Sequence, residues 1–342
     1  MKKILVTGGT GYIGSHTVVE LQLKGFEVLI VDDLSNSSIE VLDNITKISG
    51  IKPQFEQFDL SDEAKTADYF KRNNDISGII HFAAFKAVGE SMQKPLEYYR
   101  NNVGSLLNIL EGMKTQGIKN LVFSSSCTVY GQPDELPVTE SAPIKQAWSP
   151  YGNTKQMCEE ILRFTTMQLP IRAIALRYFN PIGAHETALI GELPLGVPQN
   201  LVPFITQTAI GLRAKLNVFG GDYNTPDGSA VRDYIHVVDL AKAHVIAVER
   251  MMGEKGKLNM EIFNLGTGNG FSVLQVIKSF EKVTGEKLNY EIVPRRAGDV
   301  EQTWADTSFA NDELGWKAEK SLDEMMLSAW KWEKALAAKK NS

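Results

Sequence analysis

The sequence predicts an α/β fold in which a doubly wound parallel sheet of the Rossmann type is joined to a smaller C-terminal α/β domain. Short β-branched runs alternate with helix-length amphipathic segments in the first half of the chain. A glycine-rich turn follows the first of these runs, and the composition changes near Asn180. Strands separated by helices need crossover connections, and such connections produce a parallel sheet with helices on both faces.

The expected elements follow in chain order. Lys3–Thr7 is predicted to be a buried strand, and the next helix is expected from about Ile13 to Lys24, before Gly25. Further strands are expected at Glu27–Val31, Gln54–Phe58, Gly78–Phe82, Asn120–Ser124 and Arg172–Arg177. The segment Pro181–Pro203 is rich in glycine and proline, so loops and a domain boundary are expected there. Later helices are expected at about Val237–Met252, Val273–Thr284 and Leu322–Leu336.

The composition limits the classes of function that this chain can have. It has 342 residues, of which 43% are hydrophobic and 23% charged, as in ordinary globular proteins. A net charge of −5 argues against nucleic acid or an anionic membrane as a partner. We expect no signal peptide and a cytoplasmic location, because no long apolar run occurs and Cys127 and Cys158 form no disulfide framework. The five histidines form no ligand-spaced pair, so we expect no metal.

A glycine-rich turn, Thr7–Gly14 (TGGTGYIG), directly follows the first strand and opens the first helix. Glycines here let a pyrophosphate touch bare backbone at the N-terminus of a helix, where free N–H groups and the helix dipole favour an anion. Asp32 directly follows the second expected strand, 18 positions after Gly14. A carboxylate at this point suits the ribose hydroxyls of NAD and repels the 2′-phosphate of NADP. A merely structural turn, with Asp32 as a helix cap, is the alternative.

Tyr151 and Lys155 form the candidate catalytic pair. Ser149 and Pro150 predict the start of a helix, on which the spacing of four residues places both side chains on one face. A nearby ammonium and a positively charged nicotinamide would lower the pKa of the phenol, as the oxidation of an alcohol requires. Ser126 ends a serine-tipped strand at the carboxyl edge of the sheet, where it could share the substrate proton. Taken alone, such a pair is more typical of a solvated helix face.

Several motifs carry a resemblance to a known family. Thr7–Gly14, the Tyr151-x-x-x-Lys155 pair and Ser124–Gly131 resemble the extended short-chain dehydrogenases/reductases. Five further motifs, in the same order along nearly the whole chain, are similar to the UDP-sugar 4-epimerases of that family: His81–Gly89, Lys94–Asn102, Arg177–Gly183, Val231–Asp239 and Arg295–Asp299.

The resemblance implies an activity and a cofactor. In such enzymes Tyr151 would remove the O4 proton while the C4 hydride passes to NAD, and the 4-keto sugar would turn over and take the hydride back. The expected reaction is therefore the interconversion of UDP-glucose and UDP-galactose, a step of galactose metabolism without net oxidation. Lys155 would hold the nicotinamide ribose and tune Tyr151, and Ser126 would bond the sugar O4.

The resemblance also implies which residues line the two sites. The expected NAD site comprises Gly8, Gly11, Tyr12, Ile13, Gly14, Asp32, Asp59, Leu60, Phe82, Ala83, Lys86, Asn101, Tyr151, Lys155 and Tyr178. The expected UDP-sugar site comprises Lys86, Ser126, Tyr151, Asn180, Asn200, Leu201, Phe219, Arg232, Arg296, Asp299 and Thr303.

Two features bear on the nucleotide sugar. Arginines can clamp phosphate oxygens, so Arg232 and Arg296 are candidates to anchor the diphosphate, and Asn200 precedes a helix start whose N–H groups favour an anion. Relatives carry either a bulky tyrosine or a small residue at the position of Thr303. We therefore hypothesise that the N-acetylated substrates UDP-GlcNAc and UDP-GalNAc are also accepted.

The resemblance further implies a nucleotide-binding domain over residues 1–180 and a UDP-sugar-binding domain over residues 181–342, with parts of residues 233–266 packing back on the first. It also implies a homodimer through the helices near Tyr99–Met113 and Pro150–Met167.

Alternative functions are those of a nucleotide-sugar 4,6-dehydratase, a 4-reductase and a non-catalytic NAD-binding protein. The lack of a carboxylate just after Ser126 argues against the first, and Asp32 argues against the second. Cys127, with no histidine beside it, is expected to be a structural thiol.

Overall fold

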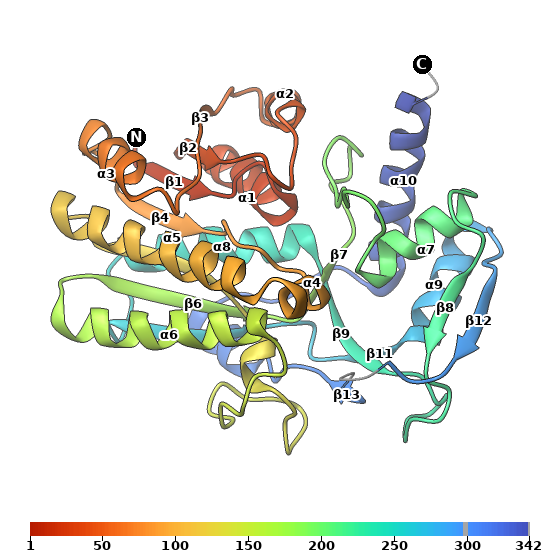
Figure 1. Cartoon of the computed structure of the whole chain (residues 1–342). Coiled ribbons are helices and arrows are strands. Elements are labelled where there is room, and N and C mark those ends of the chain that lie inside the picture. Colours follow the sequence, from red (N-terminus) through yellow and green to blue (C-terminus); the bar gives the residue numbers. More distant parts are fainter. Residues whose placement is uncertain (297–299, 341–342) are drawn as a thin grey trace.

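The computed structural model describes residues 1–296 and 300–340, and a parallel sheet of seven strands forms its larger part (Figure 1). The strand order is β10-β6-β5-β4-β1-β2-β3, and every pair is parallel. The strands are β1 (Lys3–Thr7), β2 (Glu27–Asp32), β3 (Gln54–Gln57), β4 (Gly78–His81), β5 (Asn120–Ser126), β6 (Arg172–Tyr178) and β10 (Met260–Leu265). The predicted doubly wound sheet is therefore confirmed.

Helices cover both faces of this sheet because neighbouring strand residues point to opposite sides and are both apolar. In β1, Ile4 and Val6 pack on one side and Leu5 on the other. The first side is covered by α1 (Tyr12–Leu23), α2 (Glu40–Ser49) and α8 (Val237–Met252). The second side is covered by α3 (Glu63–Arg72), α5 (Pro95–Gln116) and α6 (Pro150–Gln168). The short helix α4 (Val88–Gln93) and the 3₁₀ turn η1 (Cys127–Tyr130) lie at the carboxyl ends of the strands.

A second, smaller unit lies beside the carboxyl edge of the large sheet (Figure 1). Its four-stranded sheet contains β7 (Asn180–Ile182), β9 (Val231–His236), β11 (Gly270–Ser272) and β13 (Gln302–Thr303). A parallel pair is formed by β8 (Leu216–Phe219) and β12 (Tyr290–Val293). The helices α7 (Leu201–Ala209), α9 (Val273–Thr284) and α10 (Leu322–Lys340) surround a core of its own.

The chain crosses between the two units more than once. It leaves the large sheet after β6, forms β7 and β9 in the second unit, and returns as α8 and β10. β10 pairs with β6 over Met260–Leu265, and α8 packs on α1. A strand of the large sheet therefore comes from the second half of the sequence. No helix in the described ranges is long and apolar enough to span a bilayer.

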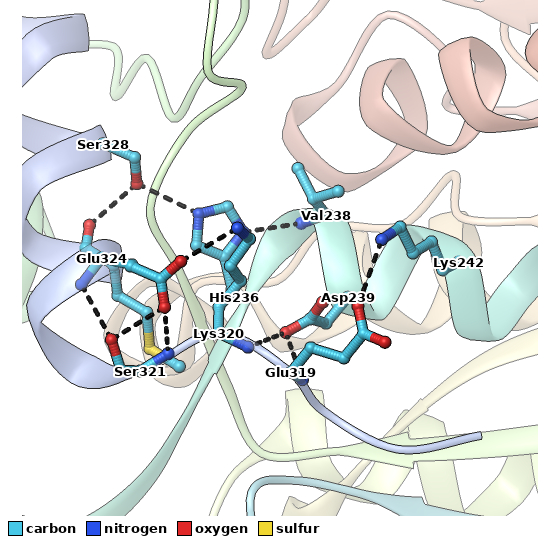
Figure 2. A network of polar contacts seen from close by, with 10 residues as sticks. His236, Val238, Asp239, Lys242, Glu319, Lys320, Ser321, Glu324 and Ser328 are labelled. Atoms are coloured by element: carbon cyan, nitrogen blue, oxygen red, sulfur yellow. Dashed lines mark hydrogen bonds and ion pairs between the residues drawn. The ribbon is translucent and has the colours of Figure 1, made fainter.

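A polar network fixes the point at which the chain returns, and Figure 2 shows it. His236 ends β9, and its Nδ1 accepts a hydrogen bond from the Val238 N–H at 3.1 Å. The proton of the neutral ring therefore lies on Nε2, which donates to the Ser328 hydroxyl of α10 at 3.1 Å. Asp239 accepts from the backbone N–H groups of Glu319 and Lys320. The start of α8 is thereby tied both to α10 itself and to the segment just before α10.

The histidines make stability depend on pH. Burial lowers the pKa of every histidine from 6.5, to about 3 for His16 and His81 and to about 4 for His236 and His244, and that of His185 is lowered as well. The unfolded chain therefore binds protons that the folded chain excludes. We expect the free energy of unfolding to fall as the pH falls from about 6.5 to about 5, by up to about 1.4 kcal/mol per pH unit for each histidine.

Urea unfolding at a series of pH values measures this slope. His236→Asn keeps an acceptor for the Val238 N–H but has no titrating ring, so its slope should be smaller by one histidine's share. The comparison stops near pH 5, because buried carboxyl groups such as Asp239, whose pKa burial raises, begin to take up protons in the folded state below it. A free energy that stays constant over this range would contradict the expectation.

Candidate active site

The glycine-rich turn forms a bare backbone surface between β1 and α1. Gly8 has a φ of +69°, which only glycine adopts readily, and a Cβ on it would lie 2.8 Å from the Ala83 backbone nitrogen. A Cβ on Gly14 would lie 2.1 Å from the Gly8 carbonyl oxygen. α1 begins at Tyr12, and its Gly11 cap carries no side chain to occupy the free N–H groups. The turn is therefore open to an anion at a helix N-terminus.

Asp32 lies against this turn although it is distant in sequence. It is the last residue of β2 and is 8% exposed. Its carboxylate accepts hydrogen bonds from the Thr10 N–H at 3.2 Å, from the Leu34 N–H at 2.9 Å and from the Ser37 hydroxyl at 3.2 Å. The alternative that Asp32 is a helix cap is wrong, because α2 begins only at Glu40 with Ile39 as its N-cap. Asp32 braces the turn, and it stands where a ribose beside the turn would meet a carboxylate.

The other residues expected at the cofactor site surround the same edge of the sheet. The Phe82 N–H donates to the Thr7 carbonyl, and the Ala83 N–H donates to the Thr7 hydroxyl. Ile13 packs against the core on the α1 side, and Leu60 is buried on the other side of the sheet. Asp59 accepts from the Ser61 N–H, the Asn101 amide donates to Asn102, and the Tyr178 hydroxyl bonds that of Ser124.

Two further residues that are expected at the cofactor site contact the segment that follows β7. The Tyr12 hydroxyl donates to the Gly183 carbonyl at 2.7 Å. The Lys86 ammonium lies 3.3 Å from a carboxylate oxygen of Glu192 and 5.9 Å from the centroid of the Tyr12 ring. The open glycine turn, the carboxylate of Asp32 beside it and a lysine near the same edge are the groups that a dinucleotide needs, so the residues fit NAD.

The helix that carries Tyr151 and Lys155 begins where the sequence predicts. The Ser149 hydroxyl accepts from the Gly152 N–H at 3.1 Å, and Pro150 is the first helical residue of α6. This start is set beside the end of β5, and the Lys155 ammonium donates to the Ser124 carbonyl at 2.6 Å. It also lies 5.9 Å from the centroid of the Tyr151 ring. Ser126, two residues along β5, lies near enough to the Tyr151 hydroxyl to lower the pKa of the phenol.

Burial controls the pKa values of this pair. Burial raises the pKa of Tyr151 to about 12, and the nearby Ser126 hydroxyl opposes this rise. Burial lowers the pKa of Lys155 to about 8, while Cys158 and Glu159 oppose the fall. The expectation that the ammonium lowers the Tyr151 pKa is thus not met in the protein by itself, because burial dominates there. A further cation, such as a bound nicotinamide, is needed to bring the phenol toward its reactive form.

Apart from Lys86, Ser126 and Tyr151, the described residues that are expected to bind the nucleotide sugar lie in the second unit. Thr303 of β13 is paired in register with Arg232 of β9, and the Arg232 guanidinium donates to the Val231 carbonyl at 2.8 Å. The Arg296 guanidinium lies 5.4 Å from the centroid of the Phe219 ring. These two pairs bring together residues from distant parts of the sequence.

Three more of these residues surround the start of β7 and α7. The Asn180 amide donates to the Asp233 carbonyl at 2.9 Å. Asn200 is the N-cap of α7, of which Leu201 is the first residue, and the Asn200 amide donates to Glu192 at 2.6 Å. Asp299 lies outside the described residues.

Two acidic residues near these groups are not apparent from sequence reasoning. Glu192 contacts both Lys86 and Asn200, and it lies in a glycine- and proline-rich segment without any periodic signal. Glu159, four residues after Lys155, forms a buried ion pair with Arg177. Its spacing on the helix could have indicated a shared face with Lys155. In the ranges that the structure describes, no three His, Cys, Asp or Glu side chains are grouped to hold a metal ion.

Comparisons with known proteins agree with this arrangement. The sequence model of a family described as GDP-mannose 4,6 dehydratase matches residues 5–328. A UDP-glucose 4-epimerase of Haemophilus influenzae is 51% identical over 332 residues, which cover 97% of both chains.

Solved structures extend the comparison. A UDP-glucose-4-epimerase of Stenotrophomonas maltophila, with bound NAD and formylated UDP-arabinopyranose, has a TM-score of 0.95 and 46% identity over 99% of this chain and 100% of that one. The enzyme of Bifidobacterium longum, in complex with NAD⁺ and UDP, has a TM-score of 0.93 and 47% identity over 98% of both chains.

Proposed function

Since this chain belongs to the extended short-chain dehydrogenases/reductases, and within them to the UDP-glucose 4-epimerases, we propose that Tyr151, Lys155 and Ser126 perform its reaction. That reaction is the NAD-dependent interconversion of UDP-glucose and UDP-galactose, and the chain is therefore an isomerase. The observation that carries the proposal is the Lys155 ammonium fixed on the Ser124 carbonyl of β5, with Tyr151 on the same helix near Ser126, at the carboxyl edge of the sheet that holds the glycine turn.

Each residue has one task in this proposal. Tyr151 takes the proton of the sugar O4 and returns it, and the Ser126 hydroxyl holds that oxygen in line with the phenol. NAD, when bound, accepts the C4 hydride and gives it back. The Lys155 ammonium, fixed on the Ser124 carbonyl, keeps a positive charge near the phenol and offers donors to a ribose. η1 carries no carboxylate beside Ser126, which argues against dehydration across C5–C6.

We propose that the diphosphate and the uridine are held by the second unit. Arg232 and Arg296 supply charge-assisted donors for phosphate oxygens, and the N-terminus of α7 adds backbone N–H groups after Asn200. The Phe219 ring beside Arg296 offers a flat apolar face. Asn180 and Leu201 line the same region, and Asp299, outside the described residues, is proposed to bind with them. Anchoring at these groups would leave the sugar free to turn.

Replacement of Tyr151 by phenylalanine tests the assignment of the base. Purified wild-type protein should convert UDP-galactose to UDP-glucose without net reduction of its cofactor. Tyr151→Phe should keep NAD bound and lose roughly 10²- to 10⁴-fold in kcat, because general acid–base catalysis contributes about that much. Tyr69→Phe removes the hydroxyl of a buried tyrosine on α3 and serves as the control. Near wild-type turnover in Tyr151→Phe would show that the base lies elsewhere.

We also propose that N-acetylated UDP-sugars are accepted, because Thr303 is of intermediate size and lies next to Arg232 on the neighbouring strand. The wild-type protein should therefore epimerise UDP-GalNAc as well as UDP-galactose. Thr303→Tyr should abolish turnover of UDP-GalNAc and retain turnover of UDP-galactose, while Thr303→Ser should retain both. Coupled assays with the two substrates measure the ratio. No detectable turnover of UDP-GalNAc by the wild-type protein would refute this proposal.

A homodimer is proposed through α5 and α6. Met157, Ile161 and Phe164 follow one face of α6 at helical spacing, and Leu107 is a further exposed apolar residue on α5, which packs on α6. Met157 and Phe164 are 40% and 53% exposed, and Leu107 is 48% exposed. Such a continuous apolar face is typical of an interface.

A cytoplasmic location is also proposed, since both cysteines of the chain are free thiols.

Sedimentation of a charged variant tests the dimer. Phe164→Glu should convert the dimer to a monomer at micromolar concentration, because a carboxylate would be desolvated at the interface. Leu258→Glu places the same charge on a leucine that is 69% exposed outside α5 and α6, and it should leave the mass unchanged. A monomeric wild-type protein at tens of micromolar would contradict the proposal.

A further inference from the structure

A buried ion pair lies directly behind the catalytic residues, and the mechanism above makes no use of it. Glu159 of α6 and Arg177 of β6 form a bidentate pair, with Nε–Oε1 and Nη2–Oε2 distances of 2.9 Å and 2.5 Å. The side chain of Arg177 is 4% exposed and that of Glu159 is 9% exposed. Both charges are therefore withdrawn from water and depend on each other.

The pair is the centre of a larger polar network. The Ser125 hydroxyl of β5 donates to Glu159 Oε1 at 2.5 Å. The third nitrogen of the guanidinium is a donor as well: Arg177 Nη1 donates to the Tyr130 hydroxyl of η1 at 2.9 Å. Tyr130 in turn donates to the Asn264 side chain of β10 at 2.7 Å. One network thus joins α6, β5, η1, β6 and β10.

Three members of the network, Ser125, Arg177 and Glu159, lie close in sequence to residues of the site. Ser125 lies between Ser126 and Ser124, whose carbonyl receives the Lys155 ammonium. Arg177 precedes Tyr178, whose hydroxyl bonds Ser124. Glu159 lies one helical turn after Lys155 and two turns after Tyr151 on the same helix. The network therefore connects the helix that carries the base to the strand that carries Ser126.

Burying such a pair is not an efficient source of stability, because desolvation offsets much of the attraction and well-packed apolar side chains can replace it. A bidentate contact does restrict the packing of α6 on β6. Both hydrogen bonds form only when the helix has one particular position along its axis and one rotation about that axis. From this we infer that Glu159, held by Arg177 and Ser125, is a positioning residue that fixes Tyr151 and Lys155 in the reactive geometry relative to Ser126. Displacement of a catalytic group by about 1 Å can cost about 100-fold in rate.

Glu159 has a second, electrostatic effect. The titratable groups that face the Lys155 ammonium are Tyr151, Cys158 and Glu159 on α6 and His81 on β4. Of these, Glu159 carries the formal negative charge, which the charge of Arg177 partly offsets. This negative charge favours the protonated form of Lys155, whereas burial favours the neutral form. Loss of this charge should lower the Lys155 pKa below about 8. The alkaline limb of the kcat profile should then move to lower pH.

Three variants separate position from charge, and the test rests on the proposed epimerase activity. Glu159→Asp keeps the charge but is too short for the bidentate contact; it should lower kcat by about 100-fold without moving the alkaline limb. Ser125→Ala removes one hydrogen bond and should lower kcat by about tenfold. Glu159→Gln should lower kcat and also move the alkaline limb to lower pH. In all three, the KM for UDP-galactose should stay within about twofold and NAD should remain bound.

A second buried ion pair provides the matched control. Arg250 of α8 and Glu261 of β10 are also bidentate, with side chains 9% and 7% exposed, but they lie at the amino end of β10, away from the site. Glu261→Gln should lower the unfolding temperature as Glu159→Gln does, with wild-type kcat and pH profile. If Glu159→Gln does not fold, Ser125→Ala and Glu159→Asp decide the question.

Wild-type kcat in both Ser125→Ala and Glu159→Asp would overturn the inference, and so would an equal loss of kcat in Glu261→Gln. A wild-type protein without epimerase activity would instead refute the proposed function, and the inference would fall with it.

Discussion

Parallel pairing of β1, β4, β5 and β6 is the constraint on which the rest of the structure depends. Parallel strands end at one edge of the sheet, so Gly8 after β1, Phe82 after β4 and Ser126 at the end of β5 come together although they are far apart in sequence. The same pairing forces each connection to cross over as a helix, which places the N-termini of α1 and α6 at that edge. The backbone hydrogen bonds between these strands therefore fix the position of the site, whichever side chains the strands carry.

The site combines groups whose burial opposes their own ionisation. Tyr151 is driven toward its neutral form and Lys155 is drawn toward deprotonation, so neither is ready for proton transfer by burial alone. The fixed contact of Lys155 with the Ser124 carbonyl and the charge of Glu159 favour the ammonium. A cofactor that brings positive charge completes the balance for Tyr151. This arrangement links the reactivity of the base to cofactor binding, because the phenol of Tyr151 stays neutral until the positive charge of the cofactor is present.

Many helices and strands could be predicted because their signals are local. Lys3–Thr7, Val237–Met252 and Val273–Thr284 have the bounds expected from apolar runs and end signals, and the Ser149–Pro150 start of α6 follows from capping chemistry. The strands β5 and β6 are each longer than expected, because their parallel pairing continues to Ser126 and Tyr178 and shows only in the folded chain. The membership of β10 in the large sheet depends on a return crossing that no local pattern reports.

The sequence by itself determined the cofactor fingerprint, the Tyr151–Lys155 spacing and the succession of strands and helices along the chain that carry them. Glycine, helix caps and strand periodicity act over a few residues, so their signals are local. Only the tertiary structure decided how distant charges meet. Glu192 joins Lys86 to Asn200, and Glu159 joins Arg177 to Ser125 beneath the catalytic helix. Such contacts depend on the height and rotation at which one element packs on another, and these are properties of the assembled core.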